Sequence, residues 1–376
     1  MLVALDFGDG DQDSRMQELS ELAASAGALV VGTVTGRRAR PDPALFAGKG
    51  KVEEIDALRR TATADLVIFD HTLSGVQQRN LEQKLLCRVV DRASLILDIF
   101  ALRARSAEGK LQVELAQLAH LATRLAGGWT HLERQKGGIG LRGPGETQLE
   151  TDRRLIGERV KLLRGRIARV ARSRAVQSRT RRRAEVRTVA LVGYTNAGKS
   201  TLFNRMTGAK AYAADKLFAT LDTTLRKVFV PGAVPIVLSD TVGFIRDLPH
   251  DLNAAFRSTL TEAADADLIL HVIDGSSSER DQQVAAVDSV LAEIGAAEVP
   301  QIRVLNKIDL ADLAPGVERD GCGNISTVRL SALTGVGCAD LRFALAERFP
   351  VSTIAGPMPA STRTSLPDQE LPPRSA

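Results

Sequence analysis

The chain has 376 residues, 44% of them hydrophobic and 25% charged, with a formal net charge of +5. This composition leaves room for two or three packed domains and excludes collagen-like, disordered and disulfide-scaffold proteins. No apolar run approaches the roughly 18 residues of a membrane helix, and the first 14 residues are acidic where a signal peptide would be basic. The 3 cysteines form no CxxC pair, so we expect a reduced, cytoplasmic protein without stable membrane insertion.

The positive charge is concentrated in one segment. Residues 151–187 carry 13 Arg and 1 Lys against 3 acidic side chains, a net charge of +11, so the rest of the chain sums to −6. A contact with a polyanion and a solvated helical face explain this segment equally well. With only 11 Phe, 2 Tyr and 1 Trp in the chain, backbone and shape contacts to structured nucleic acid fit better than stacking on bases.

In residues 1–106, short apolar runs alternate with helical ones, which predicts a small α/β domain with a parallel sheet. The predicted strands are 29–35, 66–70 and 87–91, and the predicted helices are 16–27, 52–61 and 77–86.

Residues 107–186 are predicted to form an antiparallel helical hairpin. Apolar residues recur at spacings of three and four between Leu111 and Leu132, and again between Leu149 and Val170. Between these two seams lies the loop 136–146, whose five glycines and one proline predict irregular backbone. Because this glycine-rich tip also carries basic side chains, it favours a contact element over a mere connector.

Residues 187–350 contain the motifs that predict a chemical activity. A short apolar strand, 188–192, leads directly into Gly193-Tyr-Thr-Asn-Ala-Gly-Lys-Ser200 and then into an amphipathic helix, which is the context of a phosphate-binding loop. Its glycines let backbone N–H groups wrap the phosphates of a nucleotide beside a helix N-terminus. We expect Lys199 to reach the β- and γ-phosphates and Ser200 to give an oxygen to Mg²⁺.

Three further motifs follow, each at the end of a predicted strand. Asp240-Thr-Val-Gly243 offers a carboxylate to Mg²⁺ and the Gly243 N–H to the γ-phosphate. Asn306-Lys-Ile-Asp309 offers a carboxylate that accepts from guanine N1 and N2, donors that adenine lacks there, and Ser331-Ala332 would close over the base edge. Four pieces in this order predict a guanine-nucleotide site in a doubly wound α/β domain.

Together these motifs resemble the translation-factor-related GTPases, which have a Ras-like doubly wound fold. The resemblance implies GTP and GDP as ligands, Mg²⁺ held by Ser200, Thr220 and Asp240, and catalytic roles for Lys199, Thr220 and Gly243. Thr220 is chosen over two neighbouring threonines by its similarity to the family's Phe-Ala-Thr-Leu-Asp segment. The implied nucleotide contacts are Gly193, Tyr194, Thr195, Asn196, Ala197, Gly198, Lys199, Ser200, Thr201, Phe218, Ala219, Thr220, Leu221, Asp222, Asp240, Thr241, Val242, Gly243, Asn306, Lys307, Ile308, Asp309, Ser331, Ala332 and Leu333.

Two residues bear on the rate of hydrolysis. Ras-like GTPases place a glutamine after this Asp-x-x-Gly motif to orient the attacking water, and here the position holds Phe244. Phenylalanine cannot hydrogen-bond water, which predicts slow intrinsic hydrolysis completed by a partner surface or an ion. Asn196 resembles the asparagine that helps to hold K⁺ in potassium-stimulated GTPases, but many such loops carry Asn without that property, so both readings stay open.

The glycine-rich segment 137–154, together with 193–204 and 240–252, is similar to the HflX family of ribosome-associated GTPases. The likeness extends over about residues 15–350. It implies a GTP-dependent switch that binds the large (50S) ribosomal subunit and its rRNA and splits or rescues stalled ribosomes under stress. We expect a monomer, because a switch that docks on one ribosome needs no self-association. A passive hibernation or large-subunit assembly factor is the alternative; an RNA-modification GTPase is weakened because no catalytic cluster lies outside 187–350. Residues 351–376, rich in proline, are expected to be a disordered tail.

Overall fold

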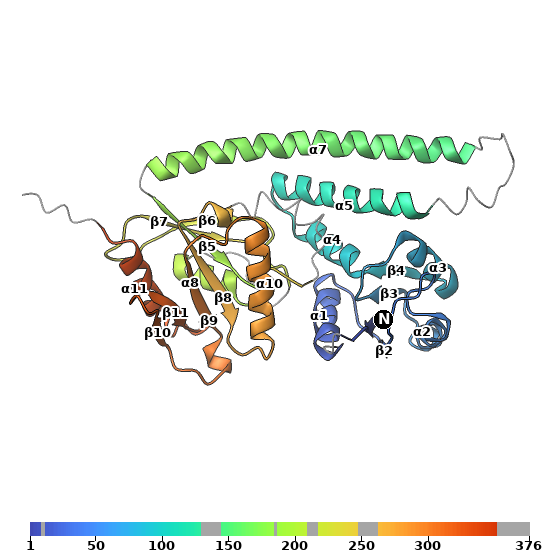
Figure 1. The fold of residues 1–376 in the computed structure, drawn as a ribbon, viewed down its shortest axis with the longest axis horizontal. Coiled ribbons are helices and arrows are strands. Elements are labelled where there is room, and N and C mark those ends of the chain that lie inside the picture. Colours follow the sequence, from blue (N-terminus) through green and yellow to red (C-terminus); the bar gives the residue numbers. More distant parts are fainter. Residues whose placement is uncertain (9–11, 129–143, 184–185, 209–216, 247–261, 352–376) are drawn as a thin grey trace, which may run out of the picture.

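The computed structural model describes residues 1–8, 12–128, 144–183, 186–208, 217–246 and 262–351. These residues form an N-terminal α/β domain, a pair of long helices and a C-terminal α/β domain, as Figure 1 shows. None of the described helices is both long and apolar enough to cross a membrane.

The N-terminal domain is built on a parallel sheet with the strand order β2-β1-β3-β4, which confirms the predicted sheet type. Its strands are buried on both faces: Leu2 packs with helices α1 and α4, and the next residue, Val3, packs with α2 and α3. The elements are β1 (Leu2–Asp6), α1 (Gln12–Ser25), β2 (Thr33–Arg37), α2 (Lys49–Thr61), β3 (Leu66–Phe69), α3 (Gly75–Leu85), β4 (Arg88–Asp91) and α4 (Arg92–Arg103).

Two predictions for this domain were wrong or incomplete. The predicted strand 29–35 begins only at Thr33, where its ladder with β1 starts, and Leu29 and Val31 are exposed at 84% and 44%. The central strand β1 and the helix α4 were not predicted, although both are strongly apolar. A short apolar run has no period that distinguishes a buried strand from a buried helix.

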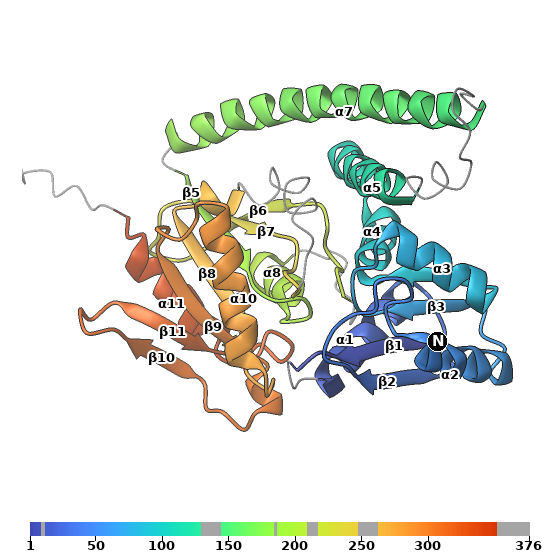
Figure 2. The same ribbon diagram turned by 45° about the vertical axis from the view of Figure 1, so that its right-hand side comes forward.

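The middle of the chain forms two helices, α5 (Ala107–Gly128) and α7 (Pro144–Arg183), which lie antiparallel in Figures 1 and 2. Arg159 of α7 pairs with Glu114 of α5 at 2.6 Å, and Leu163 is the most buried residue described on α7. Both views show α7 extending above both α/β domains. The described residues of these two helices thus form an antiparallel pair. Along the second predicted seam the side chains from Ile156 to Val170 are buried or half-buried, whereas Ala122 of the first seam is exposed.

The predicted loop 136–146 lies outside the described residues up to 143. Its last three residues belong to α7, so the expectation of irregular backbone was wrong there. Proline is favoured at the first position of a helix because its fixed φ suits the helix and its missing N–H would have no intrahelical partner. The predicted tail also lies outside the described residues, except for Val351.

The C-terminal domain contains a seven-stranded sheet with the order β10-β11-β9-β8-β5-β7-β6, parallel except at its two edges. Helices α8 and α11 cover one face and α10 covers the other, so the sheet is doubly wound as predicted. The elements are β5 (Arg187–Val192), α8 (Lys199–Thr207), β6 (Thr224–Val228), β7 (Ile236–Asp240), β8 (Leu268–Asp274), α10 (Arg280–Glu293), β9 (Gln301–Asn306), the 3₁₀ turn Ile308–Leu310, β10 (Gly316–Arg319), β11 (Ile325–Arg329) and α11 (Cys338–Arg348).

Candidate nucleotide site

The phosphate-binding motif forms the turn between β5 and α8. Gly193 and Gly198 have φ values of +151° and +91°, and a Cβ at either position would collide with Val272 O or Asn306 Nδ2. Only glycine therefore allows the loop to pass so close to β8 and β9. The Lys199 ammonium is buried under the loop and donates to the carbonyls of Gly193 and Tyr194 at 3.0 and 2.7 Å.

The three predicted Mg²⁺ ligands lie together. Ser200 Oγ donates to Asp240 Oδ2 at 2.8 Å, and Thr220 Oγ1 donates to the same oxygen at 3.0 Å. The two hydroxyls are 2.7 Å apart. Each comes from a different segment: the start of α8, the loop before β6 and the end of β7. The fold thus brings two hydroxyl oxygens and one carboxylate to a single point.

These residues fit a divalent cation. Asp240 Oδ1 is buried and has no hydrogen-bond partner among the described residues, so one carboxylate oxygen is left to face a positive charge. Oxygen ligands of this kind are those that Mg²⁺ prefers. Elsewhere in the described part of the chain, no three His, Cys or acidic side chains gather in a way that could hold a metal ion.

The electrostatics of the site favour a ligand that brings a negative charge to Lys199 and a positive charge to Asp240. Burial lowers the pKa of the Lys199 ammonium to about 8, and the nearby Asp240 carboxylate only partly opposes this. Burial also raises the pKa of Asp240, against the hydrogen bond from Ser200 and the charge of Lys199. A phosphate beside the ammonium and a cation beside the carboxylate would relieve both costs.

The predicted base-recognition motifs meet at the ends of β9 and β11. Asn306 Nδ2 donates to Ala197 O at 2.8 Å, and Asn306 Oδ1 accepts from the Ala332 N–H at 2.8 Å. This buried amide therefore ties the phosphate loop to the segment that begins at Ser331. Lys307 has a left-handed backbone, with φ +61°, and pairs with Asp274 at 2.8 Å, while Asp309 is exposed on the following 3₁₀ turn.

Only some of the predicted nucleotide contacts line a common depression in the surface. One depression is lined by Thr195, Asn196, Gly198, Lys199, Ser200, Thr201, Phe218, Ala219, Thr220, Thr241 and Gly243. Gly243 lies so close to the phosphate loop that a Cβ there would be 2.9 Å from Thr195 Cγ2 and 3.0 Å from Lys199 Nζ. Tyr194, Leu221 and Asp222 instead direct their side chains toward the N-terminal domain and α5. Leu333 is 70% exposed.

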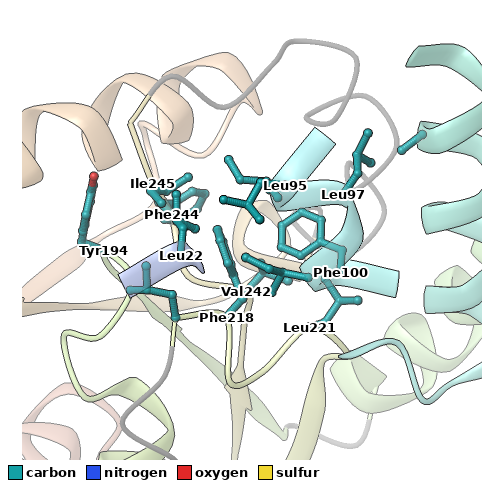
Figure 3. Close-up of a cluster of buried hydrophobic side chains, with 14 of the residues drawn as sticks. Leu22, Leu95, Leu97, Phe100, Tyr194, Phe218, Leu221, Val242, Phe244 and Ile245 are labelled. Carbon is teal, nitrogen blue, oxygen red and sulfur yellow. The ribbon is translucent and has the colours of Figure 1, made fainter. Parts of the chain in front are cut away.

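Phe244 also points away from the depression. Its backbone bonds to the phosphate loop, with Thr195 N–H to Phe244 O at 2.6 Å and Phe244 N–H to Gly193 O at 3.1 Å. The ring is 3% exposed and belongs to a cluster that also contains Leu22 and Leu95 of the N-terminal domain (Figure 3). The residue that replaces the usual glutamine is therefore part of a domain interface.

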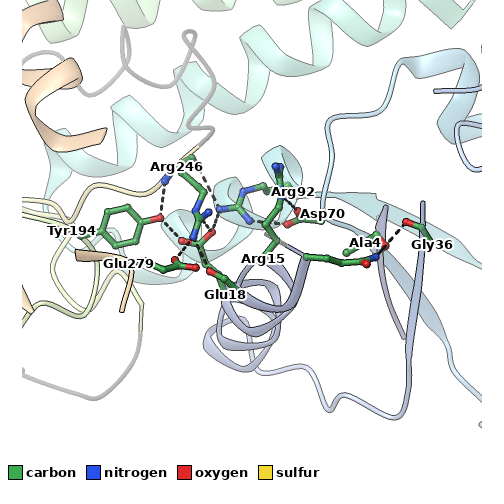
Figure 4. A network of polar contacts seen from close by, with 11 residues as sticks. Ala4, Arg15, Glu18, Gly36, Asp70, Arg92, Tyr194, Arg246 and Glu279 are labelled. Carbon is green, nitrogen blue, oxygen red and sulfur yellow. Dashed lines mark hydrogen bonds and ion pairs between the residues drawn. The ribbon is translucent and has the colours of Figure 1, made fainter. Parts of the chain in front are cut away.

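A polar network joins the same interface and was not foreseen from the sequence. Glu18 of α1 accepts from the Tyr194 hydroxyl and from Arg92, as Figure 4 shows. The Arg246 N–H donates to Tyr194 Oη at 2.9 Å, and its guanidinium donates to Glu279 at 2.5 Å. Glu18 and Tyr194 are 176 residues apart, and no local pattern signals such a pairing.

Known protein families match three stretches of the chain. Residues 13–101 match the family described as GTP-binding GTPase N-terminal, and residues 103–181 match GTP-binding GTPase Middle Region. Residues 188–307 match the family described as 50S ribosome-binding GTPase. The three matches follow the order of the two α/β domains and the helix pair between them.

Curated relatives and a solved structure agree with these matches. GTPase HflX of Escherichia coli (strain K12) is 55% identical over 349 residues, covering 93% of this chain and 82% of that protein. GTPase HflX of Caldanaerobacter subterraneus subsp. tengcongensis is 49% identical over 337 residues, covering 90% and 77%. The crystal structure of SsGBP in complex with GDP has a TM-score of 0.51 at 24% identity, covering 93% of this chain and 98% of that chain, and so shares the fold.

Proposed function

The chain belongs to the HflX family of P-loop GTPases, which hydrolyse GTP, and from that premise we propose that it is a GTP-dependent switch on the large ribosomal subunit. The 50S subunit is the partner named in the family description that residues 188–307 match. In this proposal the GTP-bound form binds 50S as a monomer in the cytoplasm, splits or rescues stalled ribosomes under stress, and leaves after hydrolysis.

The phosphate end of the nucleotide is held by the turn between β5 and α8. The backbone N–H groups of residues 193–200 and the Lys199 ammonium bind the phosphates, and the Gly243 N–H meets the γ-phosphate. Ser200, Thr220 and Asp240 would hold Mg²⁺, which would neutralise charge on the phosphate oxygens. The shared hydrogen bonds of Ser200 and Thr220 on Asp240 support this ligand set.

Guanine is selected by the ends of β9 and β11. Asp309 accepts from the N1 and N2 donors of the base, Asn306 holds the phosphate loop against the base loop, and Ser331 and Ala332 cover the base edge. The two hydrogen bonds of the Asn306 amide support its positioning role, since they join both loops through one buried side chain.

Hydrolysis is slow until the ribosome completes the site. Phe244 offers no hydrogen bond to water and is held in the interface by its burial and its backbone bonds. A group from the ribosome, or K⁺ bound near the exposed Asn196, then has to supply the missing stabilisation.

The observation that carries the ribosomal part of the proposal is the basic face of α7. Its exposed cations run along the helix that connects directly to β5, the first strand of the GTPase domain. Such a surface binds the phosphates of structured RNA, and the low aromatic content agrees with backbone contacts. The exposed basic residues described on α7 are Arg153, Arg154, Arg159, Lys161, Arg164, Arg166, Arg169 and Arg172.

Sedimentation and light scattering test this function. The chain should pellet with purified 50S subunits in the presence of a non-hydrolysable GTP analogue and stay in the supernatant with GDP. Added to intact ribosomes, it should lower the scattered light in a GTP-dependent way as the subunits separate. Binding without any loss of scattering would favour the passive hibernation or assembly factor.

A further inference from the structure

The loop that carries Thr220 is held by the N-terminal half of the chain. The Leu217 N–H donates to Ser25 Oγ of α1 at 3.0 Å. The ring of Phe218 packs edge-on against Phe100 of α4, with centroids 4.6 Å apart (Figure 3). Leu221 is 3% exposed in the same interface. Three residues of the loop are thus anchored outside the GTPase domain.

A fourth anchor of this loop is polar. Asp222 Oδ2 accepts from the Arg105 and Ser106 N–H groups at 2.8 and 2.7 Å, and Asp222 Oδ1 accepts from the Ser106 hydroxyl at 2.5 Å. These donors immediately precede α5, which begins at Ala107. The positive end of a helix favours a carboxylate nearby, so Asp222 is well placed at the start of α5.

The packing around Asp222 leaves no room for a side chain at position 109 of α5. A Cβ at Gly109 would collide with Asp222 Oδ1, so glycine at this position lets the carboxylate approach. The Ser106 hydroxyl also accepts from the Gly109 N–H at 2.8 Å. The first turn of α5 therefore closes around a carboxylate that comes from the GTPase domain.

We propose that Asp222 is a positioning residue for GTP hydrolysis: by accepting hydrogen bonds from Arg105 and Ser106 at the start of α5, it holds Thr220, two residues away, beside the proposed metal site. This rests on the proposed role of Thr220 as a metal ligand. Coupling between two sites is reciprocal, so the nucleotide that draws Thr220 into place also strengthens the hydrogen bonds of Asp222 at the start of α5. Because α5 is the first helix of the basic hairpin, these bonds link the nucleotide state to the surface proposed to bind RNA.

The test uses the full-length protein and removes the hydrogen bonds from either side. Asp222→Ala removes the carboxylate, and Ser106→Ala removes a donor without touching the loop. Ser74→Ala is the matched control, because Ser74 caps α3 of the same domain by accepting from the Gln77 N–H at 3.2 Å, away from the loop. Thr220→Ala tests the metal role separately. For each variant we measure the Mg²⁺ concentration that gives half-maximal GTP turnover.

Hydrogen exchange provides a readout independent of activity. In the wild-type protein, the amides of Arg105 and Ser106 should exchange more slowly with Mg²⁺ and a non-hydrolysable GTP analogue than with GDP. This difference should disappear in Asp222→Ala and persist in Ser74→Ala. Equal exchange in both nucleotide states of the wild-type protein would overturn the proposal.

The turnover measurements separate the possible failures. We expect Asp222→Ala and Ser106→Ala each to raise the Mg²⁺ requirement about tenfold, as loss of a hydrogen bond to a charged group allows, and the double variant to add little more. Thr220→Ala should raise it at least as much, and Ser74→Ala should leave it unchanged. If only Thr220→Ala has an effect, the positioning role is wrong and the metal role stands. If Thr220→Ala has none, the metal role fails, and the positioning role fails with it.

Discussion

Phe244 shows how a single residue can belong to two parts of the molecule. Its backbone is bonded to the phosphate loop, while its ring is buried with side chains of the N-terminal domain. The position that orients water in Ras-like GTPases is therefore used here for packing. If the Phe244 ring turned toward the nucleotide, it would leave this interface.

We therefore predict that Phe244→Gln does not raise the intrinsic rate of GTP hydrolysis. It should lower the free energy of unfolding by about 3 kcal/mol, because a buried ring is lost and a buried amide is left without partners. Urea unfolding and single-turnover GTP hydrolysis measure the two effects, with Phe244→Leu as the apolar control. A faster intrinsic rate in the glutamine variant would show that the side chain reaches the nucleotide.

Guanine recognition makes a second prediction at this scale. Asp309→Asn should weaken GTP binding by between about 10-fold and 100-fold, because the base loses a charged acceptor. Xanthosine triphosphate, which has a carbonyl at C2, should bind this variant better than GTP does. Asp312→Asn, an exposed acidic residue nearby, is the matched control. Fluorescent nucleotide titration measures both affinities, and unchanged GTP binding in Asp309→Asn would contradict the assignment.

The residues of the nucleotide site were predictable to the extent that each motif is contiguous. Lys199, Ser200 and Asp240 have a fixed place at a strand end, and parallel strands bring such ends to one edge of a sheet. Asp222 was assigned to the nucleotide by the resemblance of its Phe-Ala-Thr-Leu-Asp segment to the family, yet its carboxylate meets donors 116 and 117 residues away. A single sequence carries no signal for a contact of that separation.

At the scale of elements, β8 contains a buried titratable group at the centre of the sheet. His271 is 1% exposed, and burial, helped by the charges of Arg303 and Lys199, lowers its pKa to about 4. Its Nδ1 lies 3.7 Å from Asp288 Oδ1 on α10, which does not offset the burial. The strand therefore holds a neutral imidazole at physiological pH.

This predicts a component of acid lability that belongs to His271. Between about pH 6.5 and 4 the unfolded chain binds a proton that the folded chain does not, so the free energy of unfolding falls as the pH falls through this window. The loss from this group is at most about 3 kcal/mol. His271→Gln should flatten the pH dependence measured by urea unfolding across the window, and an identical slope in both proteins would contradict the burial argument.

Element prediction succeeded along the second seam of the hairpin and for the strands β3 and β4, but it missed β1 and α4. The second seam of the hairpin follows helical spacing, and Ile156, Leu163 and Ile167 are among the less exposed residues of α7. The strand β1 has five residues, apolar on both faces, and such a run has no distinctive period. Helix α7 begins at Pro144 because proline suits a helix start, whereas the glycine content of this region predicts a loop.

At the scale of the whole molecule, one apolar cluster connects the N-terminal domain, α5 and both loops beside the nucleotide site. Phe100, Val113, Leu221 and Phe244 all belong to it, and they come from four separate segments of the chain. The composition and motifs predicted the separate domains and the nucleotide site. The interface between the domains could not be predicted, because it depends on complementary surfaces rather than on local pattern.

The basic hairpin makes a prediction about ribosome binding as a whole. The affinity for 50S subunits, measured by sedimentation, should fall steeply with KCl because bound cations are released from RNA phosphates. Replacing Arg164 and Arg166 by glutamine should reduce the slope of log affinity against log salt by about 1 for each phosphate that is no longer neutralised. Arg319→Gln, on β10 and paired with Glu347, removes one arginine charge elsewhere and should leave the slope unchanged. An affinity indifferent to salt would exclude binding through arginine–phosphate pairs.

The measurement that tests the central claim most directly is GTP turnover by the full-length protein with and without purified 50S subunits, in K⁺ and in Na⁺ buffer. If the ribosome completes the site that Phe244 leaves unfinished, the subunits should raise turnover at least about tenfold. A further rise in K⁺ over Na⁺ would assign part of the effect to an ion near Asn196. Turnover that is the same with and without subunits would leave GTP hydrolysis intact and contradict the claim that the large subunit is the partner.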